Sequence, residues 1–257
     1  MTKKRLLLIG SVVCLCGALL IIGFMIPWSN EPPSVEEFGP KPTTAVTTVV
    51  PSTIPTVSSQ EKYQSPVDFA TLQAENPDVY AWLTVPGTPV NYPIVQHPQD
   101  DRFYLDHNIN GDYDPNGAIF SERIYNSTDF TDSVTVLYGH DMMSGAMFGE
   151  LQRLYSDPSF LKENDEIVVY LPDRELHFEI FAALPYSRMH LLYYYQTQKK
   201  SAFDLLIDDI YSSRKLSTQL LEERRPVFGD QVIVLSTCLS GDNHYRYLVM
   251  GVCKAEQ

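Results

Sequence analysis

The sequence is poor in basic residues. It has 19 Lys and Arg against 32 Asp and Glu over 257 residues, which gives a formal net charge of -13. Three of the cations, Lys3, Lys4 and Arg5, precede every acidic residue, so the rest of the chain holds 16 basic against 32 acidic residues. Such a surface repels phosphate backbones, which excludes nucleic acid as an expected partner.

Motifs for bound metals and phosphates are also missing. The chain has no Cys-x-x-Cys, His-x-x-x-His or His-Glu-x-x-His spacing, and its acidic residues are too scattered to form a calcium loop. No Gly-rich loop of the kind that cradles phosphate is present. We therefore expect no metal site, and the chemistry must come from side chains.

Cysteine is scarce. Two of the four, Cys14 and Cys16, lie in an apolar N-terminal run, which leaves Cys238 and Cys253 for the rest of the chain. A disulfide between these two is one open interpretation for an exported protein. If residues 246–253 form one unbroken strand, the odd separation places Cys253 on the face opposite Arg246, which favours a small core residue instead.

The long apolar run covers residues 6–26 and carries no charge. Its 21 residues are enough to cross a bilayer as a helix, and the three preceding cations predict a cytoplasmic tip at residues 1–5. A cleaved signal peptide is the alternative, but the run is long for one and no small-x-small cleavage site follows it. The sequence thus favours a single-pass anchor in the cell membrane, with everything after Pro27 outside the cell.

Residues 27–60 are rich in Pro, Thr, Ser and Val and lack helical periodicity. This composition predicts an extended stalk between the membrane and a globular domain at residues 61–257.

The globular part predicts a mainly β fold. Its short apolar runs and few long helices favour eight short strands in an antiparallel-rich barrel. A short helix capped by Asp68 or Ser65 is expected near residue 72, another at residues 147–154, and a longer one from Ser201. The expected strands are residues 80–85, 90–96, 117–121, 133–138, 166–171, 175–184, 231–236 and 245–253.

One strand ends on a cysteine. Residues 232–238 form an apolar run that ends at Cys238, and a short polar turn separates it from a second run that Arg246 opens. This pattern predicts a hairpin with a thiol and a guanidinium side by side. A cysteine nucleophile also needs a base. His140 ends another predicted strand, where Gly139 lets the backbone bend, while His244, in the turn, is the rival base or an exposed turn residue.

These residues resemble the motifs of the sortase family. The run Leu235-Ser236-Thr237-Cys238 is similar to the Leu-x-Thr-Cys signature, and Arg246 follows at the family's cysteine-to-arginine spacing. The run Tyr138-Gly139-His140-Asp141-Met142 resembles the histidine segment. Three motifs in the family's order are more specific than any one of them. The resemblance extends from about residue 76 to 252, and the helix inserted before the cysteine strand is most like class B.

The resemblance implies a sortase-type barrel and a cysteine transpeptidase. Cys238 would be the nucleophile, His140 the general acid and base, and Arg246 the group that stabilises the oxyanion. Ser236 and Thr237, beside the nucleophile, are the expected substrate-binding positions. The implied donor is the sorting-signal peptide of a secreted protein, and the implied acceptor is an amine of the peptidoglycan precursor. No cofactor is required, because a thioester stores the energy of the broken peptide bond.

Three alternatives stay open. The first is a sortase that polymerises pili, in which the acceptor is a lysine amine of another protein. The second is a hydrolytic cysteine peptidase, in which the acceptor is water. The third is an anchored binding module without enzymatic activity, in which Cys238 and Cys253 form a disulfide.

Overall fold

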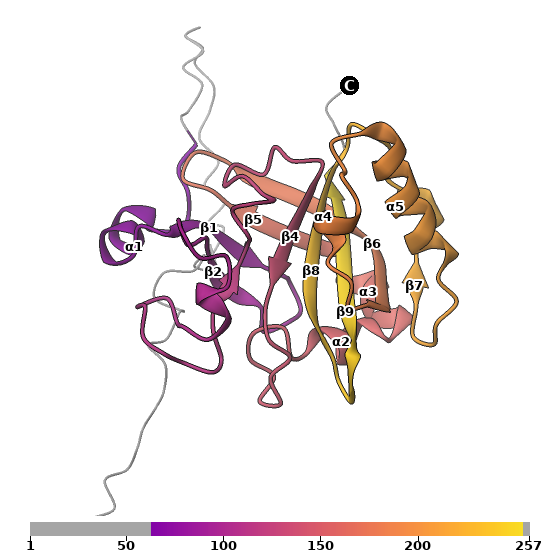
Figure 1. Ribbon diagram of the computed structural model, residues 1–257, viewed down its shortest axis with the longest axis horizontal. Coiled ribbons are helices and arrows are strands. Elements are labelled where there is room, and N and C mark those ends of the chain that lie inside the picture. The colour runs from indigo at the N-terminus through magenta and orange to yellow at the C-terminus, as the bar shows by residue number, and fades with distance from the viewer. Residues whose placement is uncertain (1–62, 254–257) are drawn as a thin grey trace, which may run out of the picture. The chain divides into compact units, whose positions relative to one another are not determined.

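The computed structural model describes residues 63–253 (Figure 1). The predicted tip, anchor and stalk at residues 1–60 lie outside the described residues. Within residues 63–253, no helix has both the length and the apolar character needed to cross a membrane.

Eight strands close a barrel, as predicted. Neighbouring strands follow the order β5-β1-β2-β3-β4-β8-β9-β6, and the pairing of β6 with β5 completes the ring. The pairs β2–β3 and β4–β8 are parallel and the other pairs are antiparallel. Each predicted strand overlaps an observed one: β1 (Val79–Thr84), β2 (Asn91–Val95), β3 (Ile119–Phe120), β4 (Val134–Tyr138), β5 (Glu166–Tyr170), β6 (Glu175–Ser187), β8 (Gln231–Leu239) and β9 (Asp242–Cys253).

A further strand, β7 (Gln219–Leu220), pairs with β6 outside the ring. Its two residues are too few for an alternation pattern, so no sequence pattern indicates this strand. The segment between β6 and β8 also holds α5 (Lys200–Ser212), the longest helix among the described residues, which begins one residue before its predicted start; β7 lies below its lower end in Figure 1.

Alternation along the strands sorts the core into two faces. Leu235 and Val249 point into the barrel, where they share a cluster with residues of β1, β2 and β5. Their neighbours Val234 and Met250 point outward and pack against α5. The apolar stripe of α5 lies in this outer cluster and is core packing: Phe203, Leu206, Ile207 and Ile210.

The shorter helices follow the sequence less closely. Helix α1 (Phe69–Glu75) starts as predicted, because the Asp68 carboxylate accepts a hydrogen bond from Thr71 N. Helix α2 (Leu151–Tyr155) begins four residues later than predicted, since Met147 has a positive φ of 54° that a helix does not allow. The sequence did not indicate α3 (Pro158–Glu163) or α4 (Leu191–Tyr194), nor the single turns η2 (Phe103–Leu105) and η3 (Glu222–Arg224).

His177 on β6 lies between two carboxylates on the barrel surface. Its Nδ1 is 2.7 Å from Glu166 Oε1 and its Nε2 is 3.1 Å from Glu175 Oε1. The hydrogen bond with Glu166 is the main reason why the pKa of His177 is raised, with partial burial opposing it and Glu175 adding to it. A histidine whose pKa is higher in the folded than in the unfolded state stabilises the fold. The full stabilisation is present below the unfolded pKa of about 6.5, and it is lost as the pH rises through the folded pKa.

We therefore expect His177→Gln to destabilise the protein more at pH 5.5 than at pH 8.5. The difference should stay below about 1 kcal/mol, because solvent screens a pair whose histidine is 52% exposed. Urea unfolding of both proteins at the two pH values measures it. An equal loss of stability at both pH values would contradict the assignment.

Candidate active site

His140 and Cys238 lie at the same edge of the barrel. Strands β4 and β8 are parallel and paired in register, ending with Tyr138 opposite Ser236, and Gly139 N donates to Ser236 O at 3.2 Å. His140 lies two residues after Tyr138, and Cys238 lies two residues after Ser236. Neighbouring strands in a sheet are about 4.8 Å apart. The register therefore brings the imidazole and the thiol to adjacent strand ends.

Gly139 makes room for this arrangement. A Cβ atom at this position would lie 2.5 Å from Ile119 Cδ1 and 2.8 Å from Phe148 Cδ2, closer than real Cβ atoms approach. Its φ does not lie in the left-handed region. Glycine is therefore needed at position 139 for space and not for a bend. It lets the backbone before His140 pass between two core side chains.

The β8–β9 hairpin sets Cys238 opposite Arg246, as predicted. Beyond this pair the register shifts, so that Leu239 faces Asp242 and the three residues 243–245 bulge out of β9. Bulges of this kind redirect side chains and are common beside active sites. Here the bulge separates the Cys238–Arg246 pair from the tip of the hairpin.

The same register excludes a disulfide between Cys238 and Cys253. Cys253 pairs with Gln231, seven residues from Cys238 along β8, which corresponds to roughly 23 Å at about 3.3 Å per residue. A disulfide requires Cα atoms within about 7 Å. Cys238 is a free thiol, so the disulfide-bonded binding module is wrong. Cys253 packs partly against the interior cluster, on the face predicted from its odd separation from Arg246.

A backbone carbonyl fixes the protonation pattern of His140. Its Nε2 lies 2.7 Å from Leu105 O, at the end of η2. Because a carbonyl oxygen only accepts hydrogen bonds, Nε2 carries the hydrogen, and Nδ1 is the nitrogen left for proton transfer. The sequence did not reveal this contact, since any residue supplies the same carbonyl.

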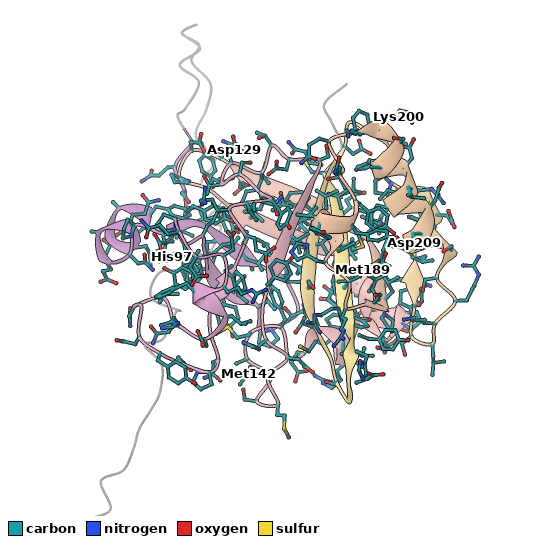
Figure 2. All side chains as sticks on the ribbon, viewed as in Figure 1. His97, Asp129, Met142, Met189, Lys200 and Asp209 are labelled. Carbon is teal, nitrogen blue, oxygen red and sulfur yellow. The ribbon has the colours of Figure 1, made fainter. Side chains whose placement is uncertain are left out.

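A surface pocket of about 610 Å³ opens where these elements meet. Cys238 and His140 line it, together with His244 from the bulge. His244 is exposed, as one of its two interpretations predicted, yet it shares the pocket with the thiol. Figure 2 shows Met142, two residues after His140, at the same end of the molecule as the hairpin tip. Within residues 63–253, no three His, Cys, Asp or Glu side chains are grouped to hold a metal ion.

Arg246 has most of its donors uncommitted. Among the described residues its guanidinium donates one hydrogen bond, from Nη1 to Tyr245 O at 3.3 Å. Arginine has five N–H donors and stays protonated, so the others are available to an oxygen that gains negative charge next to Cys238.

Ser236 and Thr237 face opposite ways. Ser236 lies on the outer face, like Cys238 two residues later, and pairs with Tyr138 and Leu248. Thr237 points into the barrel and is 2% exposed, and its Oγ1 has no hydrogen-bond partner within residues 63–253. Of the two expected substrate-binding positions, Thr237 thus faces away from the side of β8 that carries Cys238, because adjacent residues of a strand project to opposite faces.

A polar cluster that the sequence did not reveal stands beside Arg246. Glu122 Oε2 accepts from Tyr138 Oη at 3.3 Å and from His190 Nε2 at 2.5 Å, while His190 Nδ1 caps α4 by accepting from Tyr193 N. Tyr138 pairs with Ser236, two residues before the partner of Arg246 in the hairpin. Burial and Glu122 raise the pKa of Tyr138, and the positive charge of Arg246 opposes them. His190 is thus held by hydrogen bonds at both ring nitrogens.

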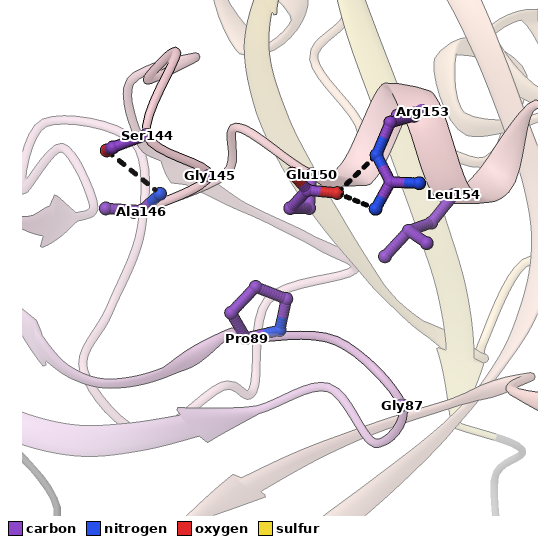
Figure 3. A pocket seen from close by; sticks show the side chains of 8 residues that line it. All are labelled: Gly87, Pro89, Ser144, Gly145, Ala146, Glu150, Arg153 and Leu154. Atoms are coloured by element: carbon purple, nitrogen blue, oxygen red, sulfur yellow. Dashed lines mark hydrogen bonds and ion pairs between the residues drawn. The ribbon is translucent and has the colours of Figure 1, made fainter.

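A second pocket, of about 480 Å³, offers no such chemistry. Figure 3 shows it between the turn at Gly87 and Pro89 and the start of α2, where Arg153 Nε donates to Glu150 Oε2 at 2.6 Å. These two side chains neutralise each other, and neither cysteine nor histidine lines the pocket. We therefore assign the active site to the pocket of Cys238.

Comparison with known proteins agrees with this geometry. The family model described as a sortase domain matches residues 83–254. The chain belongs to the sortase family. Sortase B of Listeria monocytogenes is 32% identical over 167 residues, which span 65% of this chain and 65% of that curated relative. This family assignment confirms the resemblance of the three motifs.

Solved structures point to the same class. Sortase B from Listeria monocytogenes matches with a TM-score of 0.59 and 29% identity, over 71% of this chain and 98% of that one. A Streptococcus pyogenes class B sortase involved in pilus biogenesis matches with a TM-score of 0.62 and 28% identity, over 73% and 98%. The chain is thus most similar to class B sortases, as the helix before the cysteine strand predicted.

Proposed function

We propose that this sortase cleaves a C-terminal sorting signal of secreted proteins and transfers the acyl group to an amine of the peptidoglycan precursor. The observation that carries the proposal is the row formed by His140, Cys238 and Arg246 at the ends of β4, β8 and β9. Such a row supplies the three parts of thiol acyl transfer: a base, a nucleophile and an oxyanion donor.

In the first half of the reaction, the Cys238 thiol passes its proton to Nδ1 of His140, and the resulting thiolate attacks the scissile carbonyl carbon. Negative charge moves to the carbonyl oxygen, which accepts hydrogen bonds from Arg246 and from backbone N–H groups. The intermediate collapses with cleavage of the C–N bond, and the departing amine takes a proton from Nδ1 of His140. The product is a thioester on Cys238.

In the second half, the acceptor amine attacks the thioester carbon. His140 removes a proton from the amine, and collapse of the second oxyanion intermediate releases the Cys238 thiolate and the new amide. The outward orientation of Ser236 keeps it as the proposed contact for the bound peptide. No step needs a cofactor, because the thioester passes the acyl group to the amine.

The N-terminal segment supports a location of the catalytic domain at the outer face of the cell membrane. An uncleaved anchor at residues 6–26 and a stalk at residues 27–60 hold the catalytic domain outside the cell. Both the secreted donor and a lipid-linked precursor arrive at this surface, so tethering raises the effective concentration at which they meet the enzyme.

Pilus polymerisation is the second candidate. The Streptococcus pyogenes relative involved in pilus biogenesis favours it, since that chain is matched over 98% of its length. The chemistry on Cys238 is the same, and the acceptor is a lysine amine of another protein.

A transfer assay tests the proposal. The detergent-purified full-length protein is incubated with a panel of sorting-signal peptides and increasing concentrations of either a peptidoglycan-stem amine or a lysine-containing pilin peptide. A transpeptidase diverts a growing share of product from acid to amide as the amine rises, and the preferred amine separates the two candidates. A product that remains the carboxylic acid at every amine concentration would show a hydrolytic peptidase instead.

Arg246 should act mainly on the chemical step. We expect Arg246→Ala to lower kcat by roughly 10²- to 10³-fold, the usual cost of losing one oxyanion donor, with KM for the donor peptide changed much less. Arg246→Lys should be intermediate, because the charge stays and the planar fork is lost. Steady-state kinetics of the three proteins measure it. An effect on KM alone would assign Arg246 to peptide binding.

A further inference from the structure

Ser240, at the tip of the β8–β9 hairpin, is held from two sides. Its Oγ donates a hydrogen bond to Asp141 Oδ2, and its N–H donates to Gln152 Oε1 at 2.9 Å. Asp141 directly follows His140, and Gln152 lies on α2. These contacts join the hairpin of the nucleophile to parts of the chain 99 and 88 residues away.

The hairpin tip has little else to fix it. Ser240 and Gly241 are exposed, and the regular β8–β9 pairing is interrupted by the bulge just after Cys238. On the other side of the bulge, Arg188 N donates to His244 O at 3.3 Å, which anchors β9 and not the turn. Leu239 packs partly against the interior cluster and pairs with Asp242, and beyond Leu239 the side chains of Asp141 and Gln152 hold Ser240 against the barrel.

We propose that Ser240 is a positioning residue that, through Asp141 and Gln152, holds the Cys238 thiol in register with the His140 imidazole. Ser240 lies two residues after the nucleophile and Asp141 one residue after the base, so their hydrogen bond joins the two segments that carry the reacting groups, and both residues line the pocket of Cys238. The inference rests on the proposed function for its kinetic consequence. Misplacement of reacting groups by about 1 Å costs on the order of 10²-fold in rate.

Kinetics of Ser240 variants test the proposal. We expect Ser240→Ala to lower kcat at least about tenfold, with KM for the donor peptide within about twofold and the melting temperature within about 2 °C. Ser240→Thr, which keeps the hydroxyl, should recover most of the activity. Ser144→Ala is the matched control, because this exposed serine lies in the loop after His140 and does not line the Cys238 pocket. Wild-type kcat in Ser240→Ala, or no recovery in Ser240→Thr, would overturn the proposal.

A mutant cycle tests the pairing itself. If Ser240 and Asp141 act through their hydrogen bond, the variant carrying Ser240→Ala and Asp141→Ala should be no slower than the slower single variant. Multiplication of the two single effects would show that the residues act independently and would overturn the inference.

Alkylation of Cys238 by iodoacetamide separates this inference from the proposed function, because it needs no substrate. The rate, followed by mass mapping across pH 5–9, reports the thiolate and its surroundings. We expect Ser240→Ala to change the rate near pH 7 at least about threefold and Ser144→Ala to leave it unchanged. Superimposable profiles for wild type and Ser240→Ala would overturn the positioning role, whether or not transfer activity is found.

Discussion

Cys238→Ala should abolish both thioester formation and amide formation, with kcat reduced by more than about 10³-fold. A methyl group cannot attack the carbonyl, so the route through an acyl-enzyme is closed. The fold should survive, because the position is only half-buried at the end of β8. Product formation by chromatography, together with circular dichroism of the variant, separates loss of chemistry from loss of structure.

Cys253→Ala is the matched control for this prediction. Cys253 lies at the other end of the hairpin and packs against the barrel interior, so its replacement should leave kcat within about twofold. Retention of a tenth or more of the activity by Cys238→Ala would rule out the thiol mechanism.

His140→Ala should lower kcat by roughly 10²- to 10⁴-fold, the range expected for loss of a general acid and base. Both halves of the reaction need this group, first to protonate the departing amine and then to deprotonate the incoming one. His244→Ala should stay within about threefold of wild type, because the bulge leaves that side chain exposed and β4 already supplies an oriented imidazole.

The pair of histidine variants is informative because both side chains line the pocket of Cys238. Initial rates with a saturating donor peptide and a fixed amine compare them directly. Loss of activity in His244→Ala together with full activity in His140→Ala would show that His244, and not His140, is the base.

Local pattern was enough to predict the barrel strands and the Cys238–Arg246 pair. Short apolar runs mark most strands, successive residues alternate between the two faces, and a short polar turn between two strands leaves little freedom in which residues face each other. The same alternation also indicates the orientation of Thr237. Because Cys238 faces outward, the adjacent Thr237 must point into the barrel, where it is buried.

The meeting of His140 with Cys238 depends on long-range topology. Strands β4 and β8 are parallel neighbours with β5, β6 and β7 between them in the sequence, and no local pattern reveals such a pairing. Only the order of the three motifs, through their resemblance to a family, pointed to it. The contacts that position the two groups are still less visible, since Leu105 contributes a backbone carbonyl and Ser240 a common turn side chain.

The most direct test of the thiol mechanism is the mass of the protein after incubation with a cleavable sorting-signal peptide in the absence of any amine. We expect an added mass equal to the acyl fragment, mapped to Cys238 after proteolysis and removed when an amine is supplied. No adduct with a peptide that the protein demonstrably cleaves, or an adduct on any other residue, would contradict it.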